Sequence, residues 1–387
     1  MKYNLSDICD YAKGKIDVAV LDEDTYISTE NMMPNKGGIT RTSSLPTVAQ
    51  TQSFFAGDVL VSNIRPYFKK IWFAEYDGGC SNDVLVFRAK DGVSKRFLYY
   101  VLADDTFFDY SMATSKGTKM PRGDKAAIMK YEVPEFTYEE QEKIAGILEV
   151  LDRKIQLNTE INENLLQQAQ AMYKSWFIDY EPFDGVRPAN WIIGTIDDLA
   201  KEVVCGKTPS TKVKEYYGSD VPFITIPDMH GNTYAVTTER YLSNYGAASQ
   251  AKKTLPPKSI CVSCIGTAGL VTFVASESQT NQQINSIIPK DEYSPFYIFL
   301  LMQTLSEVIN KLGQSGSTIV NLNKAQFGKI KVTVPSVPDM KAFDETVAPL
   351  FALILANQKE NIHLSSVRET LFPLLMSGKL DVSDLDL

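Results

Sequence analysis

The sequence has few of the residues that perform catalysis or bind metals. It contains two histidines, His230 and His363, and neither has a possible partner ligand at metal-binding spacing. Glycine-rich nucleotide-binding loops and the G-x-S-x-G motif of hydrolases are missing. Because no nucleotide cradle and no acid–base constellation can be found, we expect a chain that is not an enzyme on its own and holds no metal or cofactor.

Cysteine is also scarce. The 5 cysteines show no disulfide framework, which favours a reducing compartment such as the cytoplasm. Cys261 and Cys264 form half of a zinc or redox motif, but no second C-x-x-C follows, and their SICVSC run is typical of a strand. Buried strand cysteines are therefore the better interpretation. Long apolar runs are missing too, and no segment approaches the ~20 apolar residues of a membrane span.

Positive charge is in deficit. The 387 residues include 39 Lys and Arg against 47 Asp and Glu, which gives a formal net charge of -8. That balance argues against a polyanionic partner such as nucleic acid. The excess acidity, however, lies almost wholly in residues 138–187 and 338–387, and the segments that precede them are close to neutral. The objection to nucleic acid therefore applies to two segments and not to the whole chain.

The chain is too long for one hydrophobic core, and its domains are copies of each other. The stretch GDVLVSNIRPYFKKIWFA from Gly57 aligns with KSICVSCIGTAGLVTFVA from Lys258. Further on, Val-Pro at Val133 and at Val334 opens a second matching pair that contains N-x-x-x-N-x-x-L in both copies. The sequence is therefore a tandem duplication of a globular domain followed by a long helix.

Each globular half has an α+β pattern. Short β-branched runs bounded by Gly, Pro and Asn predict strands, and helical stretches intervene around 95–104 and 296–312. The predicted strands lie at 59–62, 84–87, 260–263 and 271–275. We expect two similar mixed α/β domains separated by two long helices that form an antiparallel coiled coil with pseudo-twofold symmetry. The predicted segments are 1–136 (first domain), 137–187 (central helix), 188–336 (second domain) and 337–387 (C-terminal helix).

The central helix has a strong start signal and a long apolar seam. Thr137 and Glu140 form a capping-box pattern. The residues that follow have the 4-3-4-3 spacing of a coiled coil: Ile144, Leu148, Leu151, Ile155, Asn158, Asn162, Leu165, Ala169, Met172 and Trp176. The second copy repeats the spacing, interrupted by Arg368 in the seam and by Pro349 and Pro373 near its ends: Leu350, Ile354, Asn357, Asn361, Leu364, Leu371 and Leu375.

The asparagines in these seams indicate a specific helix pair. An ordinary amphipathic helix packed on its own domain is the alternative interpretation of each seam. Asparagine at a seam position, however, costs stability and fixes partner and register. We therefore expect Asn158 and Asn162 to face Asn357 and Asn361 in an intramolecular antiparallel pair.

Basic residues gather at loops of both copies, where they could hold phosphates while Asn, Gln and Arg reach base edges. A solvated lysine-bearing face is the commoner meaning of any one cluster, but matching positions in both copies strengthen the DNA interpretation. In the first half the candidates are Arg65, Lys69, Lys70, Lys116, Lys119 and Arg122. In the second half they are Lys207, Thr208, Ser210 and Lys212 in GKTPSTK, with Ser317 and Thr318 in a later loop.

The stretch EEQEKIAGILEVLDRKIQLNTEINENLLQQAQAMYKSWFIDYEP resembles the central conserved helix of the specificity subunit of Type I restriction–modification systems. SGKLDV, VSCIGTAG, TNQQIN and GKTPSTK are similarly typical of that family, and the resemblance covers essentially the whole chain. It implies two target-recognition domains, each of which reads one half of an asymmetric bipartite site in double-stranded DNA. It also implies that the helix pair sets the spacing and docks two methyltransferase subunits.

The resemblance implies that catalysis belongs to partners. Methyltransferase subunits would bring S-adenosylmethionine for adenine-N6 methylation, restriction–translocase subunits would bring ATP and Mg, and no membrane is involved. A specificity portion of a fused modification enzyme and a coiled-coil adaptor without a DNA role remain alternatives. Gln282 and Gln283 could instead only cap their loop by hydrogen bonding. The expected DNA-facing positions are Ser62, Asn63 and Arg65 in the first half and Gly266, Thr267, Gln282 and Gln283 in the second.

Overall fold

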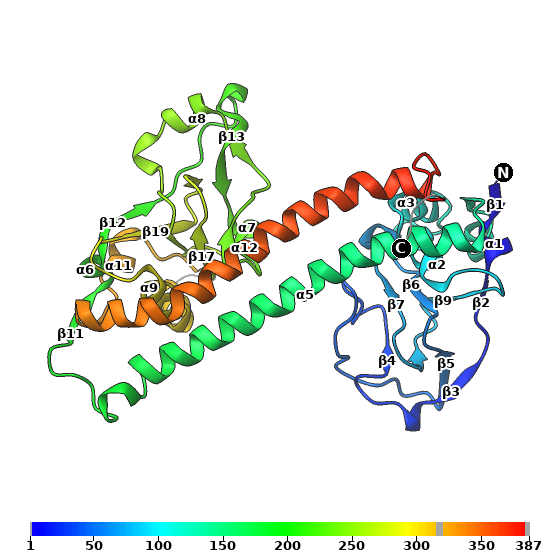
Figure 1. The fold of residues 1–387 in the computed structure, drawn as a ribbon, viewed down its shortest axis with the longest axis horizontal. Helices are drawn as coiled ribbons and strands as arrows, with labels where there is room; N and C mark the ends of the chain where they lie inside the picture. Colours follow the sequence, from blue (N-terminus) through cyan, green and yellow to red (C-terminus); the bar gives the residue numbers. More distant parts are fainter. Residues whose placement is uncertain (1, 315–319, 384–387) are drawn as a thin grey trace. The chain divides into compact units, whose positions relative to one another are not determined.

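The computed structural model describes residues 2–314 and 320–383. The chain divides into two compact units, Met1–Arg153 with Ser365–Leu387 (unit 1) and Lys154–Leu364 (unit 2). Helices α5 (Tyr138–Phe177) and α12 (Val337–Met376) each contribute a segment to both units. Each unit therefore combines one globular half of the duplication with parts of both long helices (Figure 1).

Unit 1 contains two sheets that pack around its core, with strand orders β2-β9-β6-β7 and β3-β5-β8-β4, and a short β1-β10 ladder. Helices α2 and α3 come directly after β9 in the chain. The strands are β1 (Lys2–Asn4), β2 (Cys9–Tyr11), β3 (Lys15–Asp17), β4 (Tyr26–Ile27), β5 (Gln50–Phe54), β6 (Val59–Ser62), β7 (Ile71–Phe73), β8 (Gly78–Cys80), β9 (Val84–Ala89) and β10 (Glu132–Pro134). The helices and turns are α1 (Leu5–Ile8), η1 (Val18–Val20), η2 (Pro66–Phe68), α2 (Lys95–Ala103), α3 (Asp105–Ala113) and α4 (Lys125–Ile128).

Unit 2 repeats this plan, with strand orders β12-β19-β16-β17-β14 and β15-β13-β18 and a β11-β20 ladder. Its strands are β11 (Ile192–Thr195), β12 (Ala200–Cys205), β13 (Tyr217–Ile224), β14 (Tyr234–Ala235), β15 (Tyr241–Leu242), β16 (Ile260–Ser263), β17 (Val271–Val274), β18 (Gln279–Thr280), β19 (Ile284–Pro289) and β20 (Lys331–Val334). Its helices and turns are η3 (Glu181–Phe183), α6 (Ile196–Leu199), η4 (Lys214–Tyr216), α7 (Ile226–Met229), α8 (Asn244–Ala248), η5 (Ala251–Lys253), α9 (Pro295–Thr304), α10 (Ser306–Gly313) and α11 (Lys324–Gly328).

The duplication is confirmed at the level of topology, because β2-β9-β6-β7 in unit 1 and β12-β19-β16-β17 in unit 2 have the same order and antiparallel pairing. The uninterrupted apolar run of β6 has a physical reason. Val59 and Val61 pack into the core beside α2, whereas Leu60 packs into a second cluster on the other face. A strand that is buried on both faces shows no alternation of polar and apolar residues.

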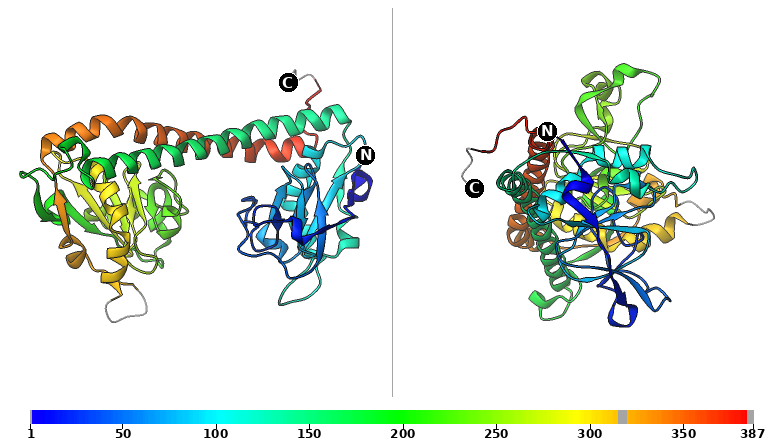
Figure 2. Two further views of the ribbon diagram at one scale, coloured as in Figure 1. Left: turned by 90° about the horizontal axis from the view of Figure 1, so that it is seen from below. Right: turned by 90° about the vertical axis from the view of Figure 1, so that its right-hand side faces the viewer.

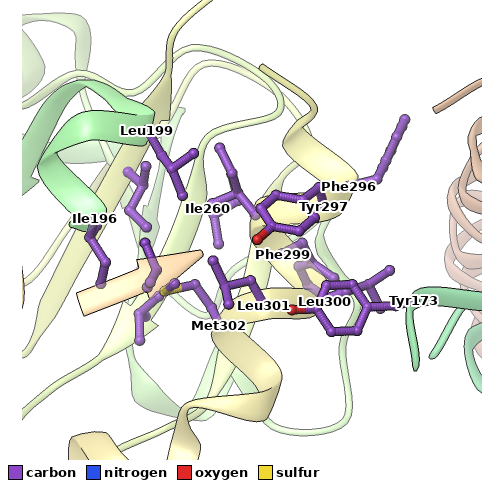
Figure 3. Close-up of a cluster of buried hydrophobic side chains, with 14 of the residues drawn as sticks. Tyr173, Ile196, Leu199, Ile260, Phe296, Tyr297, Phe299, Leu300, Leu301 and Met302 are labelled. Atoms are coloured by element: carbon purple, nitrogen blue, oxygen red, sulfur yellow. The ribbon is translucent and has the colours of Figure 1, made fainter. Parts of the chain in front are cut away.

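The largest core lies in unit 2, where α9 packs against the sheet and against α5 and α12. Figure 3 shows α9 side chains such as Tyr297 and Phe299 next to Tyr173 of α5. The Phe273 ring of β17 stacks on Phe299 with a centroid distance of 4.4 Å. The continuous apolar run of α9 is explained by this burial on all sides. The predicted helix over 296–312 is two helices, because the chain turns at Leu305.

The start of α5 matches its sequence pattern. The Glu140 carboxylate accepts a hydrogen bond of 2.7 Å from the Thr137 backbone N–H, and the Thr137 hydroxyl accepts one of 3.3 Å from the Glu140 N–H. These reciprocal bonds satisfy donors that a helix start leaves without partners. Helix α12 continues through Pro349, which is exposed.

Within unit 2, α5 and α12 run side by side and antiparallel (Figures 1 and 2). The Asn158 amide donates to the Asn361 side-chain carbonyl at 2.8 Å, and Asn357 donates to Asn162 at 2.9 Å. Asn158 also donates to Glu360 at 2.7 Å. The structure therefore brings the four seam asparagines together, in the pairing that an antiparallel helix pair requires.

The same two helices meet in unit 1, where the seam contains a charged pair. The Nε atom of Arg368 lies 2.5 Å from a carboxylate oxygen of Asp152, without the alignment of a good hydrogen bond. The Tyr100 hydroxyl of α2 donates to the other Asp152 oxygen at 3.0 Å. Arg368 interrupts the apolar seam because it neutralises this carboxylate, which is mostly buried.

Candidate nucleic-acid interface

In each unit, three loops meet at one end of the central strands. In unit 1 they are the turn after β6 (63–70), the turn before β9 (81–83) and the loop between α3 and α4 (114–124), together called loop cluster 1. In unit 2 the corresponding segments are 264–270, 281–283 and the described residues 320–323, together called loop cluster 2. The two clusters occupy equivalent places because they follow equivalent strands of the repeated sheet.

Backbone hydrogen bonds hold loop cluster 1 together. The Asn63 N–H donates to the Asp83 carbonyl at 2.8 Å, and the Arg65 N–H donates to the Pro121 carbonyl at 2.8 Å. These bonds join segments that are far apart in the sequence. Side chains of all three loops are therefore displayed on one frame.

Loop cluster 2 has the same frame. The Cys264 N–H donates to the Gln283 carbonyl at 2.8 Å, and the Gly266 N–H donates to the Val320 carbonyl at 3.1 Å. An isolated bridge joins Ile265 to Asn321, as another joins Ile64 to Arg122 in unit 1. The duplication therefore preserves the framework of the interface as well as the fold.

The predicted residues Ser62, Asn63 and Arg65 lie together in loop cluster 1. The Ser62 hydroxyl donates to the Ile64 carbonyl at 3.1 Å and so shapes the turn. Asn63 is only 8% exposed and its Oδ1 atom has no hydrogen-bond partner among the described residues. Arg65 is half-buried, and its Nε atom also has no hydrogen bond within the described structure. Buried polar atoms without partners are uncommon, and they suit a surface that is completed by a ligand.

Lys116, Lys119 and Arg122 give loop cluster 1 its positive charge. Lys116 forms an ion pair of 2.5 Å with Asp124, and Arg122 forms one of 3.0 Å with Asp83. The lysine and arginine side chains in these pairs remain 82% and 55% exposed. Exposed ion pairs of this kind contribute little stability, so a phosphate can replace the carboxylate partner at small cost.

Lys69 and Lys70 are used differently. The Lys69 ammonium pairs with Asp105 at 2.9 Å, and the Lys70 ammonium donates to the Thr29 carbonyl at 2.6 Å. Partial burial lowers the pKa of Lys70. Both ammonium groups therefore fasten the turn to neighbouring segments, and phosphate contact by either lysine stays a prediction.

In loop cluster 2, glutamines connect the segments. The Thr208 hydroxyl donates to the Gln282 side-chain carbonyl at 2.7 Å. The Gln283 amide donates to the Ile265 carbonyl at 3.4 Å, and the Asn281 amide donates to the Gln283 side-chain carbonyl at 3.0 Å. Both glutamines thus stabilise their loop by hydrogen bonds, which is the alternative role given to them from the sequence. Contact of either glutamine with a DNA base stays a prediction.

The other predicted positions of unit 2 are mostly exposed. Gly266, which has a φ of 78°, and Thr267 lie on the surface of loop cluster 2. Lys207, Ser210 and Lys212 are also exposed, in the loop that follows β12. Ser317 and Thr318 lie outside the described residues.

Sequence reasoning missed three residues of the two frames. Asp83 pairs with Arg122, and the Asn281 side chain accepts a hydrogen bond of 3.0 Å from the Gln283 N–H. Asn321 forms an isolated bridge with Ile265, and this position is equivalent to that of Arg122, which bridges Ile64 in unit 1. Asp83 lies in CSNDVLVF (80–87) and Asn281 lies in TNQQINSII (280–288), which are equivalent segments of the two copies. Comparison of these segments could have found both residues.

Metal and thiol chemistry find no support in the described structure. Among residues 2–314 and 320–383, no group of three or more His, Cys, Asp or Glu side chains is placed to hold a metal ion. Cys261 lies in β16, and burial raises the pKa of both Cys261 and Cys264 to about 12. In the same described part, no helix has the length and apolar character needed to cross a membrane.

Each copy of the duplicated mixed α/β fold thus displays a loop cluster, and in unit 1 that cluster is basic and exposed. Residues 1–167 and 188–364 each match the family model described as the Type I restriction modification DNA specificity domain. The chain therefore belongs to the family of Type I restriction–modification DNA specificity proteins.

Individual relatives agree with this membership. The chain is similar to the Type I restriction enzyme HindI specificity subunit of Haemophilus influenzae, with 32% identity over 98% of this chain and 99% of the relative. It is 25% identical to the MjaIX specificity subunit of Methanocaldococcus jannaschii, over 76% of this chain and 71% of that protein. The crystal structure of the S subunit from M. genitalium has the same fold, with a TM-score of 0.66 at 16% identity and coverage of 99% and 96%.

Proposed function

We propose that this chain is the DNA sequence-recognition subunit of a Type I restriction–modification complex, and that each globular half reads one half of an asymmetric bipartite site. One observation carries the proposal: the two loop clusters share a backbone frame but carry different side chains. Arg65 and Arg122 in one cluster stand where Gly266 and Asn321 stand in the other. Equal frames with different hydrogen-bonding groups suit two different half-sites.

The long helices are the proposed docking platform for two methyltransferase subunits. They carry most of the excess acidity of the chain, which suits protein partners better than phosphate. Leu157 and Ile161 of α5 are 38% and 44% exposed, at the 4-residue spacing of one helix face. The partners would supply S-adenosylmethionine for adenine-N6 methylation, and restriction–translocase subunits would supply ATP and Mg.

The decisive experiment maps methylated adenines in cells that express this chain with the methyltransferase subunits of its own system. We expect a single asymmetric motif of two half-sites with a spacer of fixed length. Exchanging Arg65 and Arg122 for the glycine and asparagine of the other copy should alter one half-site only. Methylation without a motif, or methyl transfer by the isolated chain, would contradict the proposal.

The four seam asparagines are proposed to set the register of the helix pair and hence the spacer. Replacing Asn158 and Asn361 by leucine should strengthen apolar contact but permit register slips, because leucine pairs without directional hydrogen bonds. We expect methylation at more than one spacer length, read from the same adenine map. Gln167→Leu, at an exposed position of α5, is the control for added apolar surface. A single unchanged spacer in the double variant would refute the register role.

A further inference from the structure

Two aromatic side chains on loop cluster 1 are partly exposed, and the Lys70 ammonium lies 5.8 Å from the centroid of one of them, Phe68. Tyr67 and Phe68 are 49% and 38% exposed, and their ring centroids lie 4.7 Å apart with a 52° tilt. They occupy η2, directly after Arg65. Large aromatic rings normally contribute to stability by burial, so an exposed adjacent pair in a loop indicates a contact surface.

The backbone holds this pair in a strained and fixed turn. Arg65 and Lys69, which flank η2, have left-handed φ values of 51° and 50°, a conformation that non-glycine residues rarely adopt. Hydrogen bonds of 2.8 Å from the Asn35 and Lys36 N–H groups to the carbonyls of Phe68 and Lys69 keep the turn in place. The surrounding structure thus holds Tyr67 and Phe68 in a fixed place on loop cluster 1.

The fold itself does not require the rings. The equivalent turn after β16 in unit 2 reads Gly266-Thr267-Ala268-Gly269, and it joins the same strands of the repeated sheet. Unit 2 lacks the aromatic pair and still has the same strand pairing. The pair in unit 1 is therefore better explained by binding than by folding.

The neighbours of the rings indicate what they contact. Arg65 leaves its Nε atom without a hydrogen bond among the described residues, and Asn63 leaves Oδ1 in the same state. Lys116 and Arg122 provide exposed positive charge on the same loop cluster. Cations attract phosphates, and the Tyr67 hydroxyl can donate to one, but the faces of the two rings suit the face of a base or a deoxyribose.

We propose that Tyr67 and Phe68 form an aromatic wedge that inserts at a base-pair step of the half-site read by unit 1. This inference rests on the proposed DNA-recognition function. A wedge of this kind partly unstacks the step and bends the duplex, so that more phosphates reach the basic loops. Unit 2 has no such pair in its equivalent turn, so the deformation is confined to one half of the bipartite site.

The test uses the complex of this chain with its methyltransferase subunits and a duplex that carries the mapped motif. Permanganate, which oxidises unstacked thymines, reports the deformation, and titrations at several salt concentrations report affinity. The double variant Tyr67→Ala with Phe68→Ala should bind about tenfold more weakly or worse, because stacking on each ring is lost. Its salt dependence should be unchanged, since no charge is removed. Thymine oxidation in the first half-site should disappear, except at the thymine opposite the adenine that the methyltransferase flips.

Three variants make the result specific. Tyr67→Phe keeps the ring and should behave as the unaltered complex, and Tyr67→Ala alone should show a smaller loss than the double variant. Tyr245→Ala removes a ring that is 64% exposed on α8 of unit 2, outside both loop clusters and both long helices, and should change neither readout. Unchanged affinity and unchanged oxidation in the double variant would overturn the wedge alone. An unaltered complex that binds no sequence selectively would overturn the proposed function as well.

Discussion

Replacing Lys116, Lys119 and Arg122 together by alanine is expected to weaken binding of the assembled complex to its motif by roughly 100-fold at about 0.1 M salt. Each residue is a candidate phosphate contact, and each contact releases counterions from the duplex. A plot of the logarithm of affinity against the logarithm of salt concentration should therefore have a shallower slope, by about 0.9 for each lost contact. Titration of the motif-bearing duplex at several salt concentrations measures both quantities.

The existing ion pairs of loop cluster 1 do not cancel this effect. Lys116 and Arg122 are mainly exposed, and exchange of one carboxylate partner for a phosphate changes the free energy little. Lys2 offers a matched control, because it forms a similar exposed pair of 2.8 Å with Glu132 outside the cluster. Lys2→Ala should leave the salt slope unchanged. A triple variant with an unaltered slope would show that these residues do not meet phosphate.

The strands and the long helices could be predicted because their signals are local. The apolar runs at 59–62 and 260–263 coincide with β6 and β16, and the Thr137 capping box marks the start of α5. The duplication added further information, because two copies of one fold must place equivalent loops at equivalent ends of the sheet. The break at Leu305 could not be predicted, since no proline or glycine marks it.

The site was harder to predict because its contacts join distant segments. The sequence shows that Lys69 is basic, but not that Asp105 neutralises it. The sequence around Gln282 predicts a turn. It does not show that Thr208, which follows a different strand, donates a hydrogen bond to the Gln282 side chain. Arg368 is visible in the sequence only as an interruption of a seam. Its partner Asp152 is identified only when the two helices are placed side by side within unit 1.

Substituting Arg368 by alanine is expected to lower the free energy of unfolding of unit 1 by about 2 kcal/mol near neutral pH. Loss of one partner from a buried ion pair leaves the other charge uncompensated. The Asp152 side chain is 34% exposed. The expected loss of stability is therefore smaller than the roughly 3–5 kcal/mol that breaking a fully buried pair costs. Chemical denaturation of the full chain, followed by a probe in unit 1, measures the change.

The pH dependence of this variant identifies the cause. Burial raises the pKa of Asp152 above its ordinary value of 3.8, and the charge of Arg368 opposes that shift. Without Arg368 the pKa of Asp152 in the folded state rises further above its value in the unfolded state. The folded state then binds the proton more tightly, so stability is gained at low pH and is lost as the pH rises through the folded pKa. The deficit of the variant should therefore shrink on acidification, as Asp152 becomes protonated in the folded state.

The second copy supplies the rescue. Phe351 and Ala169 of unit 2, at the positions that correspond to Asp152 and Arg368, are both fully buried in an apolar core. Adding Asp152→Leu and Tyr100→Phe to Arg368→Ala should restore most of the lost stability and remove its pH dependence, because no buried polar group is then left without a partner. A deficit in Arg368→Ala that is independent of pH and persists in the triple variant would attribute the loss to packing of the arginine stem instead of charge.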